Sequence, residues 1–160
     1  AYGRNMHIES FESSYDTAKA VSLVEAVGWD LTFDKISTTN KGSVVSDIVK
    51  APSLKVFGIL YTIGDSDISK LDEQEGGYER IKIKINSLDG KEYTAFTYTV
   101  IDKKNFSDEI PKTPYIGELV KGLKDAKKLG PEGDNKVILE QLKNYVSHIL
   151  NIYKSSKKIK

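Results

Sequence analysis

Apolar and polar residues alternate most regularly over residues 78–85, where isoleucines occupy every second position from Ile81 and basic residues lie between them. A period of two is typical of a strand with one buried and one exposed face. The Asp89-Gly90 pair is a hairpin turn signal, and it returns the chain into a second alternating run at 91–100. The pattern therefore predicts a β-hairpin. Because the returning run carries aromatic side chains on both faces, we expect it to lie centrally in its sheet.

Further strands are predicted before this hairpin, where runs of Val, Leu, Ile and aromatic residues are separated by turn residues. These strands are expected at 20–27, 31–36, 42–49 and 55–63. Gly28 and Asp30 interrupt the first two runs and indicate a bend or a bulge between them. Pro52 indicates a turn between the other two.

Helices are predicted at both ends of the chain and in front of the hairpin, from capping residues and from the change to a helical period after Pro114. The first helix is expected at 6–14 with Asn5 as the cap, and the second begins at Asp65, with Ser66 or Asp67 as the cap, and stops at Gly76-Gly77. The third is expected at 114–129, before Gly130-Pro131. The fourth is expected from a cap at Asp134 or Asn135 to about Tyr153. Strands first and helices last favour an α+β fold. Residues 1–153 are predicted to form one domain, and 154–160 a flexible basic tail.

Composition limits the classes of function. The 160 residues include no cysteine, which excludes a thiol nucleophile, a disulfide framework and a Cys-ligated zinc site. Twenty-four basic and 23 acidic side chains nearly cancel, so no net field favours nucleic acid. His7 and His148 lie far apart without ligand spacing, and no phosphate-binding loop is present, so neither a metal nor another cofactor is expected. With no membrane-length apolar run and no visible signal peptide, a cytoplasmic protein is expected.

An acidic cluster at 71–78, Leu-Asp-Glu-Gln-Glu-Gly-Gly-Tyr, carries the candidate chemistry. Three carboxylates in four residues repel one another, and the pKa of one pressed toward apolar surroundings rises. Such a group can both accept and donate a proton near neutral pH. Charge runs also occur on solvated helix ends, and the cluster alone does not decide between these two interpretations.

The cluster occurs together with two other segments, Ala-Tyr-Gly-Arg-Asn-Met at 1–6 and Val-Phe-Gly-Ile-Leu-Tyr at 56–61. In this order and spacing, the three resemble the gamma-glutamylcyclotransferase family, with its Tyr-Gly-Ser-Asn loop, Gly-centred strand, Leu-Asp-x-x-Glu-Gly turn and following tyrosine. The resemblance extends from Ala1 to about Leu142. It implies an α+β fold, a small mixed β-barrel flanked by helices.

The resemblance also implies a reaction, in which a γ-glutamyl group cyclises to 5-oxoproline and releases an amine or amino acid. Glu75 matches the family's catalytic glutamate, the general acid and base, whereas Asp72 and Glu73 are expected to be solvated or structural. The predicted substrate-binding residues are Tyr2, Gly3, Arg4, Asn5, Tyr78 and Tyr115. From the residues alone, Tyr78 is equally a strand-start aromatic and Tyr115 equally a helix core residue.

Two departures from the family pattern stand at the start of the chain. Arg4 occupies the position of the family's usual serine, and its permanent charge either points outward or grips a substrate carboxylate. Few residues precede the loop, so the family's first strand is expected to be short or missing here.

Two other classes of function stay open alongside the enzyme. One is a non-catalytic small-molecule binding module on the same fold, and the other is an interaction or nucleic-acid-binding protein that uses the lysines at 154–160. The favoured prediction is a monomer or homodimer that acts on a small γ-glutamyl substrate, without nucleic acid or membrane partners.

Overall fold

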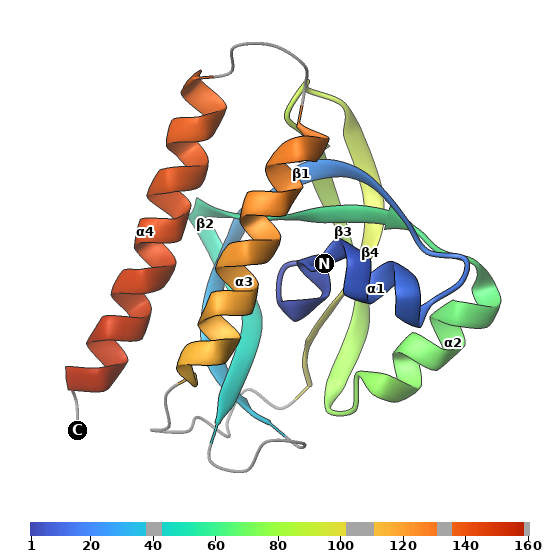
Figure 1. Cartoon of the computed structure of the whole chain (residues 1–160), viewed down its shortest axis with the longest axis horizontal. Helices are drawn as coiled ribbons and strands as arrows, with labels where there is room; N and C mark the ends of the chain where they lie inside the picture. Colours follow the sequence, from blue (N-terminus) through green and yellow to red (C-terminus); the bar gives the residue numbers. More distant parts are fainter. Residues whose placement is uncertain (38–42, 102–110, 131–135, 159–160) are drawn as a thin grey trace.

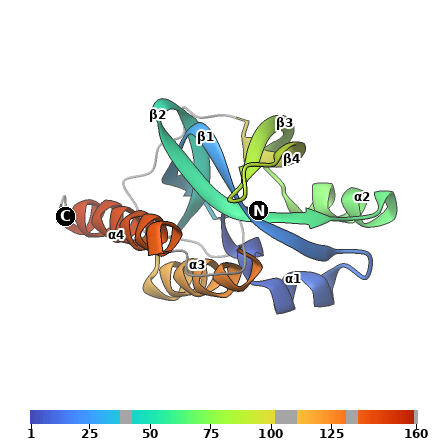
Figure 2. The ribbon, with the colours of Figure 1, turned by 90° about the horizontal axis from the view of Figure 1, so that it is seen from above.

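The computed structural model describes residues 1–37, 43–101, 111–130 and 136–158. Its elements, in chain order, are η1 (Arg4–Met6), α1 (Ile8–Ser14), β1 (Lys19–Ile36), β2 (Val44–Thr62), α2 (Asp65–Gln74), β3 (Tyr78–Ser87), β4 (Glu92–Val100), α3 (Thr113–Ala126), η2 (Lys127–Leu129) and α4 (Lys136–Lys158). A curved sheet forms one layer, and α1, α3 and α4 lie on the same side of it (Figures 1 and 2). The predicted α+β class is confirmed. No described helix is both long and apolar enough to cross a membrane.

Two long strands, β1 and β2, make most of the sheet. The predicted bulge at Gly28 is confirmed, whereas the predicted turn at Pro52 is wrong. Register shifts absorb the irregular residues between Val27 and Trp29, where Gly28 has a φ of 85°, and between Thr32 and Lys35. A β-bulge keeps a strand continuous while bending it and re-aiming its side chains. The segment around Pro52 is likewise part of β2.

The paired strands of the described chain are antiparallel, and the sheet order is β2-β1-β3-β4. The predicted hairpin is confirmed as β3 and β4, but β4 is an edge strand, not a central one. Phe96 of this strand is 53% exposed, and the Arg80 guanidinium lies 5.0 Å from the centroid of its ring. This cation and the nearby Lys82 ammonium stabilise the partly exposed aromatic ring.

The free edge of β4 curls toward the first half of β2, without a backbone ladder among the described residues. The Val100 N–H donates to Asp47 Oδ1 at 2.9 Å, and the Thr99 hydroxyl donates to the Ile48 carbonyl at 3.2 Å. The resemblance implies a small mixed β-barrel. The observed sheet is open instead, and its strand pairs are antiparallel.

The main core lies between the sheet and helices α3 and α4. Fully buried side chains include Leu23, Leu31 and Phe57 from the sheet and Leu119 and Ile149 from the helices. Each contributes about 1.5–3 kcal/mol by leaving water.

A separate small cluster, Phe11, Tyr15, Ala18 and Leu71, joins α1 to α2. The Tyr15 hydroxyl donates to Gln74 Oε1 at 2.5 Å on the edge of this cluster. Only a few apolar side chains therefore hold α2 to the rest of the domain.

The start of the chain is fixed by its contact with α3. Gly122 lies so close to η1 that an added Cβ would stand 2.8 Å from Met6 Cβ, and Met6 is fully buried. The predicted Asn5 cap is wrong, because η1 comes first and α1 begins at Ile8 with His7 as its N-cap. The Asn5 side chain is thereby left for another partner.

The cap of α2 is Gly64, in place of the predicted Ser66 or Asp67. Asp67 lies in the first turn, and it bonds Lys70 Nζ at 2.8 Å and the Thr17 hydroxyl at 2.6 Å. These contacts, led by the hydrogen bond from Lys70, lower the pKa of Asp67 to about 2.

Helix α4 continues to Lys158, beyond the predicted end near Tyr153. The predicted caps Asp134 and Asn135 and the Pro131 stop lie outside the described residues. The division into one domain and a tail stays a prediction.

Candidate functional site

A polar cavity of about 230 Å³ lies where the N-terminal loop meets the end of α2 and the edges of β2 and β4. Every predicted site residue lines it: Tyr2, Gly3, Arg4, Asn5, Glu75, Tyr78 and Tyr115. Three of its lining side chains are charged in the described part of the chain, namely Arg4, Lys35 and Glu75. The fold therefore gathers residues that the sequence separates by more than 100 positions.

Glu75 occupies the C-cap of α2, where its N–H donates to the Leu71 carbonyl at 2.9 Å. Gly77 follows with a φ of 83°, a conformation that glycine adopts without strain. This turn directs the half-buried Glu75 carboxyl toward the loop, where Oε1 accepts a hydrogen bond from Asn5 Nδ2 at 3.0 Å.

Burial raises the pKa of the Glu75 carboxyl, and the Asn5 hydrogen bond and the Lys35 charge partly oppose that shift. Burial disfavours the charged form of an acid, whereas a donor or a cation favours it. A carboxyl balanced in this way exchanges a proton closer to neutral pH than an exposed glutamate does. This is the property required of a general acid and base.

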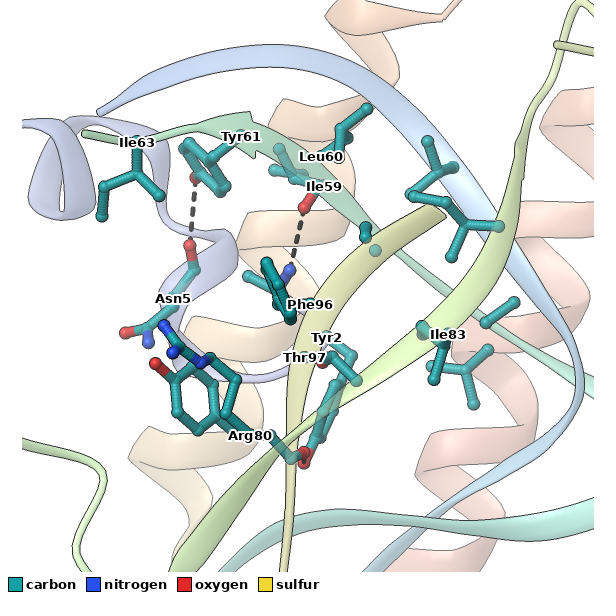
Figure 3. Close-up of a pocket in the computed structure, with 18 of the residues that line it drawn as sticks. Tyr2, Asn5, Ile59, Leu60, Tyr61, Ile63, Arg80, Ile83, Phe96 and Thr97 are labelled. Atoms are coloured by element: carbon teal, nitrogen blue, oxygen red, sulfur yellow. Dashed lines mark hydrogen bonds between the residues drawn. The ribbon is translucent and has the colours of Figure 1, made fainter. Parts of the chain in front are cut away.

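Asn5 is itself held in place, because the Tyr61 hydroxyl donates to its main-chain carbonyl at 3.0 Å (Figure 3). The first hydrogen-bonded N–H of η1 is that of Met6, which donates to the Gly3 carbonyl at 3.0 Å. The N–H groups of Gly3, Arg4 and Asn5 are therefore not used by the hydrogen bonds of η1.

Two tyrosines, Tyr78 and Tyr115, form hydrogen bonds with Ser46 of β2. The Tyr78 hydroxyl donates to the Ser46 carbonyl at 2.6 Å, and the Tyr115 hydroxyl accepts from the Ser46 N–H at 2.9 Å and contacts Ser46 Oγ at 2.7 Å. If Ser46 Oγ donates in the last pair, Tyr115 keeps its proton for a ligand. Each tyrosine thus lines the cavity and also ties elements together.

Gly3 is required by the same arrangement. An added Cβ would collide with Ser46 Oγ and stand 3.3 Å from the Tyr115 hydroxyl oxygen. A larger residue at this position would displace the groups that shape the cavity. Arg4, one position on, has an exposed side chain at the rim and does not fill the cavity.

Sequence reasoning missed several cavity residues, of which Lys35 carries a charge. Its Nζ donates to the Gly76 carbonyl at 2.7 Å and lies 4.1 Å from the centroid of the Tyr78 ring. The nearby register shift in β1 turns Lys35 toward the acid turn, and nothing in the alternation of the strand indicates that shift. Ser46, Gln74 and Tyr98 were missed for a similar reason, since their relevance depends on tertiary contacts.

The other acids of the cluster lie outside the cavity. Asp72 is exposed, accepts from the Tyr98 hydroxyl at 2.6 Å and pairs with Arg80 at 3.4 Å, and Glu73 is also exposed. Both agree with the predicted solvated or structural role. No group of three His, Cys, Asp or Glu side chains suited to a metal occurs within the described ranges.

A second hollow of about 410 Å³ adjoins the cavity at Tyr2, Asn5 and Tyr98. Its lining is mostly apolar, from strand β2 on one side and β3 and β4 on the other (Figure 3). Ala1 reaches into this space and pairs with Ile59 through two backbone hydrogen bonds of 2.8 and 2.9 Å. The hollow contains no carboxylate among its described lining residues, so the candidate acid–base chemistry lies in the smaller cavity.

Comparison with known proteins gives relatives for most of the chain. A model of the AIG2-like family matches residues 55–129. The gamma-glutamylcyclotransferase of Mus musculus is 29% identical over 133 residues, covering 78% of this chain and 69% of that protein. The Homo sapiens gamma-glutamylcyclotransferase is 27% identical over the same length and coverage.

Solved structures agree with these relatives. A crystal structure of an uncharacterized Homo sapiens protein has a TM-score of 0.73 and 25% identity, covering 89% of this chain and 83% of that one. A structure named gamma-glutamyl cyclotransferase has a TM-score of 0.68 and 22% identity, covering 90% of this chain and 96% of that one, which supports the fold. In sequence and fold, the chain is therefore similar to gamma-glutamylcyclotransferases over most of its length.

Proposed function

We propose that this protein is a gamma-glutamylcyclotransferase, which cyclises the γ-glutamyl group of a small substrate to 5-oxoproline and releases an amine or amino acid. Relatives of that name support the assignment of an enzyme. The observation that carries the proposal is the half-buried Glu75, whose pKa is raised by burial and which contacts the Tyr2–Asn5 loop in the wall of a cavity of about 230 Å³.

The reaction needs no nucleophile from the protein. The substrate's own α-amino nitrogen forms a bond to the γ-carbonyl carbon, and the bond from that carbon to the leaving nitrogen breaks. Holding tethered groups in an attacking geometry removes much of the entropic barrier. The absence of cysteine from the chain is compatible with this chemistry.

Proton transfer is the part that Glu75 performs. An α-amine has a pKa of about 8 and is largely protonated at pH 7, and only its neutral form attacks. Glu75 accepts that proton and then donates it to the leaving nitrogen, so no net proton is consumed. Such catalysis contributes about 10²- to 10⁴-fold in rate.

Negative charge develops on the γ-carbonyl oxygen as the ring closes. The N–H groups of Gly3, Arg4 and Asn5 are the proposed donors, together with the Tyr115 hydroxyl. Burial raises the pKa of Tyr115, so its hydroxyl stays protonated near neutral pH. One well-placed donor of this kind is worth about 3–4 kcal/mol in the transition state.

The test is release of 5-oxoproline from γ-glutamyl dipeptides, glutathione and γ-glutamyl-lysine, with Glu75→Gln as the matched variant. We expect turnover by the natural protein, and a loss of about 10²-fold or more in Glu75→Gln. Substrate binding by calorimetry should survive the change. Binding without turnover by the natural protein would identify a non-catalytic binding module, and equal turnover by both proteins would remove Glu75 from the mechanism.

A further inference from the structure

Lys35 contacts the acid turn in two ways and is not explained by the motifs that identified the cavity. Its ammonium group donates to the Gly76 carbonyl at 2.7 Å, and it lies over the Tyr78 ring at 4.1 Å. Gly77 lies between these two residues, and an added Cβ there would stand 3.3 Å from Lys35 Nζ. One side chain of β1 therefore touches every residue of the turn that follows Glu75.

We propose that Lys35 is a positioning residue for Glu75, which fixes the Gly76–Tyr78 turn and places a positive charge beside the carboxyl. The turn has two glycines and few steric restraints of its own. Two backbone hydrogen bonds hold it, from the Tyr78 N–H to the Glu75 carbonyl at 3.0 Å and from the Ile101 N–H to the Gly77 carbonyl at 3.3 Å, and Lys35 adds a charged donor to the Gly76 carbonyl between them. A hydrogen bond from a charged donor contributes about 1.5–3 kcal/mol, which is sufficient to select one turn conformation.

The surroundings of Glu75 make the charge of Lys35 important. Besides Lys35, the groups that act on this carboxyl are the Asn5 amide, the amino group of Ala1 and the hydroxyls of Tyr2, Tyr15, Tyr98 and Tyr115. Tyrosine hydroxyls are neutral near pH 7. The amino group of Ala1 also favours the carboxylate, but burial lowers its pKa to about 6, so Lys35 is the side chain whose charge offsets burial of Glu75 near pH 7. Burial in turn lowers the pKa of Lys35.

Removal of the charge should move the Glu75 pKa further upward. Three variants separate the contributions of Lys35: Lys35→Arg keeps a charged donor, Lys35→Gln keeps a neutral donor, and Lys35→Met keeps neither. Lys84→Gln is the matched control, because Lys84 is an exposed β3 lysine that pairs with Glu92 and does not line the cavity.

The first measurement is the NMR titration of the Glu75 side-chain carboxyl, assigned through its absence in Glu75→Gln. We expect the Glu75 pKa to rise in Lys35→Gln and Lys35→Met and to stay unchanged in Lys35→Arg and Lys84→Gln. An unchanged pKa in folded Lys35→Gln would overturn the proposal. This measurement needs no substrate, so it tests Lys35 even if the proposed activity fails.

The second measurement, which rests on the proposed function, is the pH profile of kcat/KM. The acid limb should move upward in Lys35→Gln, with a tenfold loss below the limb for each unit of movement, and activity should recover above it. Lys35→Arg should restore the natural limb. A loss that is equal at all pH values in Lys35→Gln would overturn the proposed charge effect, because misfolding or a purely structural contact has no such pH dependence.

Discussion

Replacement of Glu75 by glutamine should stabilise the folded protein at alkaline pH, although it removes the proposed catalytic group. The Glu75 pKa is raised in the folded chain mainly because burial penalises the carboxylate. Glutamine resembles the protonated acid, and its amide oxygen can still accept from Asn5 Nδ2, which now donates at 3.0 Å. The variant therefore avoids the cost of burying a charge and keeps the contact.

The sign and the pH range follow from linkage. A carboxyl whose pKa is higher in the folded chain than in the unfolded chain takes up a proton on folding between the two values, so stability falls as pH rises through that interval. The interval begins near the ordinary value of 4.5. Each unit of upward shift costs about 1.4 kcal/mol above the interval. For a domain of this size, that is about 3–6 °C in Tm.

The assay is urea unfolding at pH 4 and pH 8, followed by the fluorescence of Trp29, the single tryptophan. We expect Glu75→Gln and the natural protein to be nearly equal at pH 4, and the variant to be more stable at pH 8. Glu73→Gln is the control, because Glu73 is an exposed acid near the end of α2, two positions before Glu75. A Glu75→Gln protein that is less stable at pH 8, or a difference independent of pH, would refute the argument.

The remaining predictions concern the cavity wall and α2. Gly3→Ala places a methyl group against Ser46 Oγ, so KM should rise about tenfold or more, which is a loss of about 1.4 kcal/mol in binding free energy. Circular dichroism should show a retained fold. An unchanged KM would contradict the predicted crowding. Tyr61→Phe removes the hydrogen bond to the Asn5 carbonyl, so it should cost about 1 kcal/mol of stability and also lower kcat. An unaltered kcat would show that Asn5 does not need this hydrogen bond to hold its position. Asp67→Asn should lower Tm at pH 7, because the contacts that lower the Asp67 pKa stabilise the fold only while the carboxylate is ionised. The difference in Tm should vanish as the pH falls from about 4 through about 2. A difference that persists at pH 2 would show that ionisation of Asp67 is not its cause.

The parts of the fold that depend on local pattern were predictable from the sequence. The β3–β4 hairpin followed from strict alternation and an Asp-Gly turn, and α3 and α4 followed from a helical period. The bulge at Gly28 in β1 was predicted, but the continuity of β2 was not, because Pro52 ordinarily indicates a turn and only pairing with β1 keeps this strand whole. The edge position of β4 likewise depends on which strands pair, not on its own pattern.

The residues of the candidate site that belong to the three sequence motifs were predictable from the order of those motifs in the chain. Glu75 and the Tyr2–Asn5 loop were found because their spacing in the chain matches a family, and the fold brings them to 3.0 Å through the Asn5 amide. Lys35 was not found, because a bulge sets its direction and its partner is a main-chain carbonyl 41 positions away. Because every residue carries a backbone carbonyl, a contact with one does not require a particular residue type, and no sequence motif indicates it.

The small cluster that joins α1 to α2 has a consequence for how the protein responds to heat. Few apolar side chains hold α2, whereas the sheet with α3 and α4 shares a large core. Segments with little buried apolar surface open at lower free energy than the whole domain. Glu75 stands at the end of α2, so we expect reversible heat inactivation to begin below the temperature at which the sheet melts. A bound ligand that bridges α2 and the N-terminal loop should bring the two temperatures together.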